Sequence, residues 1–146
     1  RIAVAAEGAA GQPPRIDPVV PGITAVPQGK TVRAPLGAAF ASRSGDKGGN
    51  ANLGVWAKTP GAYAFLDQFL TVEKLKELLP DCAPYSIDRY ALPNLLAVNF
   101  YIRGILGDGA AASIRSDPQA KTLGEYLRAK WIEMPEAIIE KGYAHE

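Results

Sequence analysis

The chain has 146 residues, of which 47% are hydrophobic and 21% are charged, and its formal net charge is +1. This length suits a single domain with a hydrophobic core. Because no apolar run is long enough to cross a bilayer and charges of both signs alternate along the chain, we expect neither a membrane span nor a nucleic-acid partner.

The first 35 residues are rich in proline and glycine. Proline removes backbone donors and glycine raises the entropic cost of ordering, so we expect neither a helix nor a lasting strand there. We therefore divide the chain into a linker or arm (residues 1–35) and a folded domain (residues 36–146). The opening RIAV (residues 1–4) is also a candidate for the last strand of another domain. The chain starts at Arg1 without the pattern of a signal peptide, so we interpret it as a fragment, a processed product or part of a subunit.

The next segments predict two short strands followed by helix. LGAAFASRS (36–44) has the pattern of a buried strand, and NLGVWAK (52–58) is a second strand candidate. Thr59 before Pro60 is typical of a helix N-cap with proline at the first helical position, which predicts a helix over 60–70. The apolar spacing in 72–79 continues or restarts that helix before a proline ends it.

The middle of the chain contains one ambiguous segment. YSIDRY (85–90) alternates between two faces, which predicts a strand. LPNLLAVNFYIRGILGDG (92–109) fits a helical stripe, and Val98, Phe100 and Ile102 also fit strand alternation. We favour the helix. AASIR (111–115) is a further strand candidate.

The last third predicts a helix, a strand and a short helix. In SDPQAKTLGEYLRAKW (116–131), Asp117 is expected to cap a helix that Pro118 opens. KWIEMP (130–135) is a strand candidate, and PEAIIEKG (135–142) is a short final helix. The whole order predicts an α+β fold of the split βαβ type, an antiparallel sheet with helices on one face.

The counts of histidine and cysteine limit the chemistry. With one of each, this chain alone cannot build a cysteine and histidine zinc site, and we predict no metal and no cofactor. His145 lies beside the C-terminus, so we interpret it as a solvated residue and not as the activator of a nucleophile. Cys82 is interpreted as a packed thiol, and the lack of disulfides fits a cytoplasmic protein.

The stretch ASRSGDKGGNANLG (41–54) is the best candidate for a site. Its glycines permit backbone N–H groups to converge on one point, and Lys47 adds a cation, which together predict a nest for a phosphate or carboxylate. Asp46 is a candidate proton acceptor, so Asp46 and Lys47 are the candidate catalytic groups. We predict that the ligand is bound by Arg43, Ser44, Gly45, Gly48, Gly49, Asn50 and Asn52. The alternative is a tight connection whose polar side chains bond their own backbone.

Two further groups of polar residues are weaker candidates. Arg89, Tyr90 and Asn94 form the first group, and Arg115, Asp117 and Lys121 form the second, in which Arg115 is suited to clamp a carboxylate. The simpler interpretation makes Arg89 half of a surface ion pair and Lys121 a solvated side chain. Asn99 stands in an apolar segment, where an amide needs partners, so a structural hydrogen bond is expected.

These segments together resemble a known family. ASRSGDKGGNANLGVWA, RYALPNLLAVNF, GILGDG and RSDPQAKTLGEYLR are similar to the C-terminal domain of the acyclic terpene utilisation AtuA family. The resemblance covers about Leu36 to Met134, and SGDKGGNAN is its most specific part. It implies a ferredoxin-like fold that occurs fused to a larger N-terminal domain or as a separate small protein. The proline-rich arm matches nothing in the family and has the character of an interdomain linker.

The resemblance implies a pathway more clearly than a reaction. The family is associated with bacterial breakdown of acyclic terpenes such as citronellol and geraniol, through methyl-branched acyl-CoA intermediates. It implies that the matching polar residues of 43–52 form a shared site that faces a larger N-terminal AtuA-type domain or subunit. We therefore expect part of an enzyme acting on a carboxylate or acyl-CoA, of lyase or hydratase type, whose catalytic groups lie largely in that larger part.

Two other functions remain open on the sequence. The chain is alternatively a non-catalytic module for oligomerisation or ligand binding, because an antiparallel sheet of this class offers a free face and free edges. Trp56, Tyr101 and Trp131 are candidate anchors for such an interface, and a homo-oligomer is expected. A domain that senses a metabolite without turning it over is the third alternative.

Overall fold

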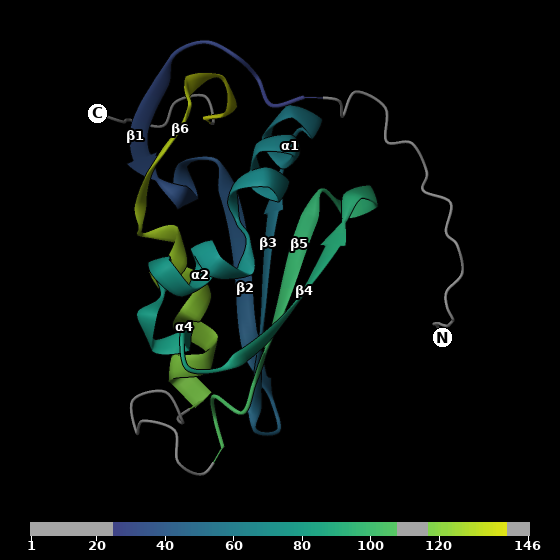
Figure 1. Cartoon of the computed structure of the whole chain (residues 1–146), viewed down its shortest axis with the longest axis vertical. Coiled ribbons are helices and arrows are strands. Elements are labelled where there is room, and N and C mark those ends of the chain that lie inside the picture. The colour runs from purple at the N-terminus through teal and green to yellow at the C-terminus, as the bar shows by residue number, and fades with distance from the viewer. Residues whose placement is uncertain (1–24, 108–116, 140–146) are drawn as a thin grey trace.

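The structure is a computed structural model, and it describes residues 25–107 and 117–139 (Figure 1). The predictions for RIAV (1–4), for AASIR (111–115) with Arg115, and for His145 therefore lie outside the described residues. The strands are β1 (Thr31–Pro35), β2 (Phe40–Lys47), β3 (Asn50–Ala57), β4 (Ser86–Leu92), β5 (Ala97–Arg103) and β6 (Trp131–Pro135). The α-helices are α1 (Pro60–Phe69), α2 (Val72–Leu78) and α4 (Asp117–Arg128), and single 3₁₀ turns occur at Leu36–Ala38, Pro80–Cys82, Pro93–Leu95 and Glu136–Ile138.

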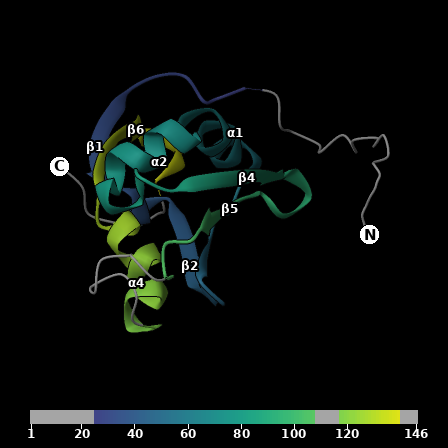
Figure 2. The ribbon, with the colours of Figure 1, turned by 60° about the horizontal axis from the view of Figure 1, so that its bottom comes forward.

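The main sheet has four antiparallel strands in the order β2-β3-β5-β4. Strands β3 and β4 are both antiparallel to β5, which lies between them, so they run parallel to each other and are joined through α1 and α2. This is the split βαβ unit, and the predicted α+β fold is confirmed. The second sheet contains only β1 and β6, which lie side by side away from β4 (Figures 1 and 2).

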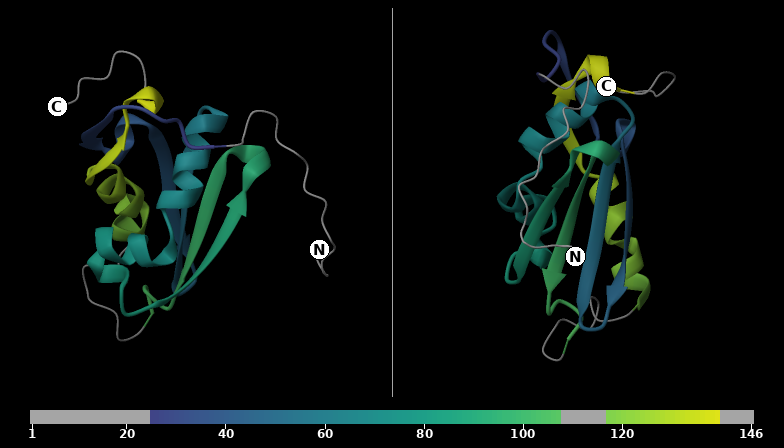
Figure 3. Two further views of the ribbon diagram at one scale, coloured as in Figure 1. Left: turned by 45° about the horizontal axis from the view of Figure 1, so that its top comes forward. Right: turned by 90° about the vertical axis from the view of Figure 1, so that its right-hand side faces the viewer.

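The three α-helices in the described part of the chain cover the same face of the main sheet (Figure 3). The right-hand view of Figure 3 shows the sheet from its other side, with the helices behind the strands. Alternate residues of β3 and β5 are buried on the helix side, as the period of two along a strand requires. The fully buried side chains include Leu36, Leu53, Val55, Leu66, Leu70, Leu75, Val98, Phe100, Ile102, Ile105, Leu127 and Met134. We call the opposite side of the main sheet, which no described helix covers, the open face.

The helix predictions in the first half are confirmed. The side chain of Thr59 accepts a hydrogen bond from the backbone N–H of Ala62 at 3.1 Å, so it caps α1 ahead of Pro60. Thr71 caps α2 in the same way through the N–H of Lys74 at 3.0 Å. Within the described residues, no helix combines the length and the apolar character that a membrane crossing needs.

The stretch 41–54, in which the sequence predicts a nest, is mostly strand. Residues 40–57 form a β-hairpin in which β2 and β3 pair from Phe40 opposite Ala57 to Lys47 opposite Asn50. Only Gly48 and Gly49 lie in the turn, and Gly48 has the positive φ of +62° that a tight two-residue hairpin turn requires. The strand predictions on either side were therefore right, and the strands extend through most of the segment between them.

The preferred helix over 92–109 is also wrong, because Ala97–Arg103 in the middle of this segment forms β5. The strand occupies a central position, where β3 pairs with one edge and β4 with the other. Its alternate residues Val98, Phe100 and Ile102 are fully buried under the helices. A helix there would leave the inner edges of β3 and β4 without backbone partners, so the tertiary hydrogen bonds override the local helical stripe.

The expectation that no strand occurs before residue 36 fails at the end of the arm. Thr31–Pro35 forms β1, which pairs with β6 from Thr31 opposite Pro135 to Pro35 opposite Trp131. The pairing is held by burial, because Val32 and Ala34 lie on the core side together with Ile132 and Met134. Of the short final helix predicted over 135–142, the described residues contain a single 3₁₀ turn at Glu136–Ile138. The boundary between arm and domain stays a prediction.

Gly124 allows helix α4 to pack directly against β2. The hydroxyl of Ser42 donates to the carbonyl of Gly124 at 2.9 Å, and the hydroxyl of Ser44 donates to the carbonyl of Lys121 at 2.9 Å. The N–H of Gly124 donates back to Ser44 Oγ at 2.9 Å. A Cβ on Gly124 would stand 2.7 Å from Ser42 Oγ, so the helix approaches the strand only because no side chain intervenes.

We predict that Gly124→Ala lowers the free energy of unfolding by about 1 to 2 kcal/mol, because the new methyl group displaces the Ser42 hydroxyl from its hydrogen bonds. Urea unfolding measures the change. In a Ser42→Ala background the obstructing oxygen is gone, so the same substitution should be less damaging. If Gly124→Ala instead raised stability by the roughly 1 kcal/mol that alanine gains over glycine in a helix, the close contact would be disproved.

Candidate functional site

The open face is polar and aromatic where the helix side is apolar. The residues of β3 that alternate with its buried ones are Asn50, Asn52, Gly54 and Trp56, and those of β5 are Ala97, Asn99, Tyr101 and Arg103. In β2, the register places Arg43, Gly45 and Lys47 opposite Gly54, Asn52 and Asn50, and therefore on the same face. Three neighbouring strands thus present polar groups on a surface without a described covering element.

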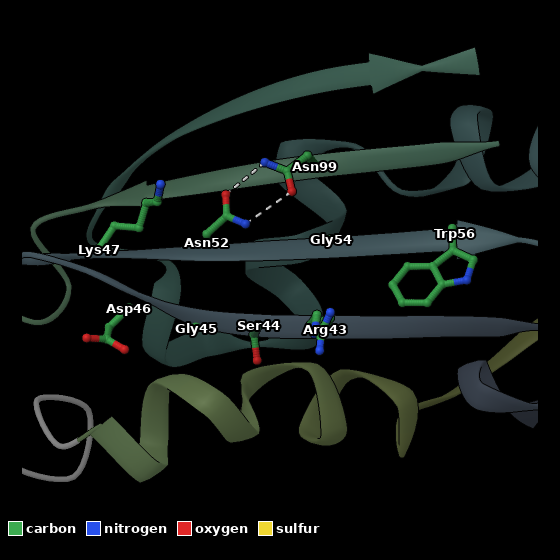
Figure 4. Close-up of a pocket in the computed structure, with 9 residues that line it drawn as sticks. All are labelled: Arg43, Ser44, Gly45, Asp46, Lys47, Asn52, Gly54, Trp56 and Asn99. Atoms are coloured by element: carbon green, nitrogen blue, oxygen red, sulfur yellow. Dashed lines mark hydrogen bonds between the residues drawn. The ribbon is translucent and has the colours of Figure 1, made fainter. Parts of the chain in front are cut away.

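A shallow hollow of about 430 Å³ occupies the β2 side of this face (Figure 4). We call it the open-face hollow, and its lining comprises Arg43, Ser44, Gly45, Asp46, Lys47, Asn52, Gly54, Trp56 and Asn99. Gly45 and Gly54 contribute no side chains, so they leave room between the larger residues around them. Trp56 stands at one end of the hollow and Lys47 at the other (Figure 4). The hollow therefore has an aromatic end and a cationic end.

A reciprocal pair of amides forms one wall of the hollow. Asn99 Nδ2 donates to Asn52 Oδ1 at 2.9 Å, and Asn52 Nδ2 donates to Asn99 Oδ1 at 3.4 Å (Figure 4). A Cβ on Gly54 would lie 3.3 Å from Asn99 Oδ1, so this glycine gives the amide its space. Each amide keeps one N–H and one lone pair for another partner. The structural hydrogen bond that the sequence predicted for Asn99 is confirmed.

The cations of the open face differ in whether a carboxylate neutralises them. A terminal nitrogen of Arg103 lies 2.6 Å from Asp88 Oδ2, and its guanidinium also stands over the ring of Tyr101 at 5.2 Å. Asp88 raises the pKa of Arg103 through this hydrogen bond and its charge. Arg43 and Lys47 have no such ion pair among the described residues, and both are exposed. Among the described residues, they are the cations of this face that no carboxylate neutralises.

The alternation of β2 separates two residues that the sequence placed together. Asp46 lies opposite the buried Ala51, on the helix side, whereas Lys47 lies on the open face. Successive strand residues point to opposite sides, so these neighbours do not form one catalytic pair. Ser44 is also on the helix side, where its hydroxyl is bonded to α4. The backbone of 45–47 is extended, so its amides alternate in direction and do not form the predicted nest.

Asn50 and the turn glycines have structural positions. Asn50 Nδ2 donates to the Tyr101 hydroxyl at 2.9 Å, and Asn50 Oδ1 accepts from the N–H of Gly104 at 2.6 Å. These bonds hold the end of β5 against the hairpin. Gly48 and Gly49 make the hairpin turn and are not part of the lining of the hollow. Of the predicted site residues on the open face, Arg43, Gly45, Lys47 and Asn52 line the hollow, whereas Asn50 does not.

In the first of the two weaker polar groups, Arg89 has a structural role. Arg89 forms the predicted ion pair with Asp67 at 3.1 Å, and its guanidinium also donates to the backbone carbonyls of Asp67 and Leu70 at 2.9 Å. It therefore fastens β4 to the end of α1. Tyr90 is 51% exposed on the open face, and Asn94 is exposed in the turn after β4. In the described part of the chain, no group of three or more histidine, cysteine, aspartate or glutamate side chains is arranged to hold a metal ion.

Three residues of the hollow are not among the predicted catalytic or ligand-binding residues, although Gly54 belongs to the stretch predicted to form the nest. Trp56 and Gly54 follow Asn52 at steps of two, so a period-two reading through the hairpin would have found them. Asn99 was assigned to a helix, and its position opposite Gly54 follows only from the register of β3 and β5. The sequence pattern that identifies Trp56 and Gly54 lies within one strand, whereas the position of Asn99 depends on pairing between two strands.

The geometry of the hollow suits binding more than bond breaking. It offers two cations, spare amide donors and acceptors, and an indole surface. Cys82 is fully buried away from it, so the thiol has no access to a ligand there. This combination is suited to a ligand with an anionic group at one end and an apolar or planar part at the other.

Comparison with known proteins places the chain in a family. A family model described as the AtuA ferredoxin-like domain matches residues 34–133. The match spans more than half of the chain, so the protein belongs to this family, and the ferredoxin-like fold expected from the resemblance is confirmed. No curated protein and no solved structure gave a significant match. The family match begins inside β1, which agrees with the place of this strand in the folded unit.

We predict that Cys82 makes stability fall at alkaline pH. Burial raises the pKa of its thiol from 9.0 to about 11, and the charge of Asp81 acts in the same direction. The folded state then holds this proton more tightly than the unfolded state. The stabilisation is complete below pH 9 and is lost as the pH rises toward 11, by about 2 kcal/mol at pH 10.5.

The measurement is denaturant unfolding at pH 8 and pH 10.5 in the parent chain and in Cys82→Ala. Other titrating groups act equally in both proteins, so the difference between them reports the thiol. The parent should lose about 2 kcal/mol more than the variant over this interval. Equal losses, or rapid modification of Cys82 by a thiol reagent in the folded protein at pH 8, would show that the thiol is accessible.

Proposed function

We propose that this member of the AtuA ferredoxin-like family is the small domain or subunit of an AtuA-like protein that handles methyl-branched carboxylate or acyl-CoA intermediates, with the open-face hollow holding the anionic end of the ligand. The observation that carries the proposal is the placement of Arg43 and Lys47 on the open face beside Asn52, without a described carboxylate to neutralise either cation.

The arrangement around the two cations supports a carboxylate at this place. Arg43, Gly45 and Lys47 follow one another on the open face at steps of two residues along β2, and Arg43 lies across from Gly54. Because Gly45 has no side chain, a ligand can lie along β2 between the two cations. Asn52 is held in position by Asn99, so its remaining N–H is fixed before a ligand arrives. Trp56 offers an apolar surface, 36% exposed, for the hydrocarbon part.

The proposal assigns chemical catalysis to a larger AtuA-type domain or subunit that faces this surface. Asp46 and Lys47 lie on opposite sides of β2, so this chain supplies one cation and not an acid–base pair. In a lyase or hydratase type of reaction, the small domain would fix the charged end while the larger part acts on the carbon chain. Neither a cofactor nor a metal is part of the proposal, and we place the protein in the cytoplasm.

We predict that Lys47→Ala weakens the binding of a branched carboxylate such as citronellate by about 1 to 3 kcal/mol, because a charged hydrogen bond is lost. Isothermal titration calorimetry on the 146-residue chain measures the affinity. Lys47→Arg keeps the charge and should retain most of it. Lys30→Ala removes an exposed lysine that does not line the hollow, and it should leave the affinity unchanged. Unchanged affinity in Lys47→Ala would remove this lysine from the site.

A non-catalytic assembly role is the second candidate, and exposed apolar side chains favour it. Tyr90 and Leu92 on β4 are 51% and 38% exposed, and Leu95 in the following turn is 67% exposed. They adjoin the outer edge of β4, which pairs with no other described strand. Such an edge and patch suit contact with a second copy of the chain.

We predict under this second candidate that the isolated chain is a dimer or larger in light scattering, and that Leu95→Ser shifts it toward the monomer because apolar contact is lost. Tyr126→Ser is the matched control, since Tyr126 is 48% exposed on α4, far along the chain from β4. A parent chain that stays monomeric and still binds the carboxylate would exclude assembly and leave the first function standing.

A further inference from the structure

A second hollow lies on the other side of β2, between this strand and α4. Its volume is about 400 Å³, and its lining comprises Ser42, Arg43, Ser44, Gly45, Lys121, Gly124, Glu125 and Arg128. We call it the edge groove. It shares the residues of 43–45 with the open-face hollow, because β2 is the outer strand of the main sheet and is accessible from both sides. Figure 4 shows α4 running along this edge of β2.

The edge groove carries an excess of positive charge. Arg43, Lys121 and Arg128 contribute three cations from two different elements, and Glu125 contributes the single carboxylate among the lining residues. Within the described ranges, none of the three cations forms an ion pair with Glu125 or with another carboxylate. The groove therefore has a formal charge of about +2 that no described residue neutralises.

Arg128 is oriented by the strand that faces it. Its Nε donates to Ser42 Oγ at 3.0 Å, and that hydroxyl is itself fixed by donating to the carbonyl of Gly124. These bonds form because Gly124 lets α4 approach β2 closely. The contact that holds α4 to the sheet therefore also orients the guanidinium of Arg128. The two terminal nitrogens form no bond to a described residue and remain as a fork of donors.

We propose that the edge groove is a binding site for a phosphoryl group. A phosphate monoester carries a charge of about −1.5 to −2 at neutral pH, which matches the excess charge of the groove, whereas a carboxylate would neutralise only part of it. Its oxygens accept in several directions, so the fork of Arg128 and the flexible cation of Lys121 bind different oxygens of one group. This site goes beyond the proposed carboxylate hollow and does not depend on it.

The two sites have separable residues. Lys121 and Arg128 line the edge groove only, and Lys47 and Trp56 line the open-face hollow only, whereas Arg43 reaches both. A variant of Lys121 or Arg128 therefore tests the phosphoryl site alone. A ligand that has both a phosphoryl group and a second anionic group would span the edge strand at Arg43.

The experiment titrates the 146-residue chain with inorganic phosphate at low salt, followed by calorimetry and by amide NMR shifts. We expect the amides of Ser42, Ser44 and Gly124 to shift. We expect Arg128→Gln to weaken binding by about tenfold or more, as for a charged hydrogen bond, and Lys121→Gln by about threefold, as for an exposed ion pair. Added sodium chloride should weaken binding further. Lys30→Gln, the matched control, should bind as the parent does.

Each outcome decides the proposal. Arg128→Gln also removes the bond to Ser42, so the exposed Lys121→Gln provides the test in a variant whose packing is unchanged, and thermal unfolding verifies both. Lys47→Ala should leave phosphate binding intact, which separates this site from the carboxylate hollow. Phosphate shifts confined to Asn52 and Asn99, or equal losses in Lys30→Gln and Lys121→Gln, would overturn the proposal. Loss of citronellate binding alone would overturn only the open-face function.

Discussion

The alternation of side chains across the hairpin β2–β3 is the constraint on which the rest of the structure depends. Each apolar residue of β3 that packs under α1 and α4 forces its neighbours on to the opposite side of the sheet. The core and the open face are therefore two consequences of one pattern. A shift of the register by one residue would bury Asn52 and Trp56 and expose Leu53 and Val55, so burial of the apolar set fixes the position of the polar one.

The same alternation explains why the candidate site is a binding surface divided by an edge strand. Even-numbered residues of β2 point to α4, and two of them, Ser42 and Ser44, have their hydroxyls committed to the helix backbone. Odd-numbered residues point to the open face, where Arg43 and Lys47 stand. Gly124 makes the first set of contacts close enough to orient Arg128. One strand thus positions cations on both of its sides, and the helix packing that stabilises the fold also shapes the edge groove.

Membership of the AtuA ferredoxin-like family and the geometry of the surface address different questions. The family identifies the kind of domain, and the residues identify the chemistry that the domain offers a ligand. The open face combines paired amides, cations that no described carboxylate neutralises and a partly exposed indole, which are groups suited to a charged organic molecule. In the described residues they are not accompanied by a metal-binding cluster, and the thiol of Cys82 is buried. The groups on the open face are the basis of the proposed ligand-binding role.

Local signals in the sequence were sufficient wherever the deciding interaction was local. Thr59 and Pro60 predict α1, the spacing of 116–131 predicts α4, and the period of two in 130–135 predicts β6. These signals suffice because caps and amphipathic faces act within one element. The motif of 41–54 likewise contains Arg43 and Lys47, the two cations that line the candidate site. Only the tertiary structure decided that this motif is a hairpin, that β5 is a strand, and that Asn99 joins Asn52. These facts depend on hydrogen bonds between different segments of the chain, and the sequence of one segment does not predict which other segment it pairs with.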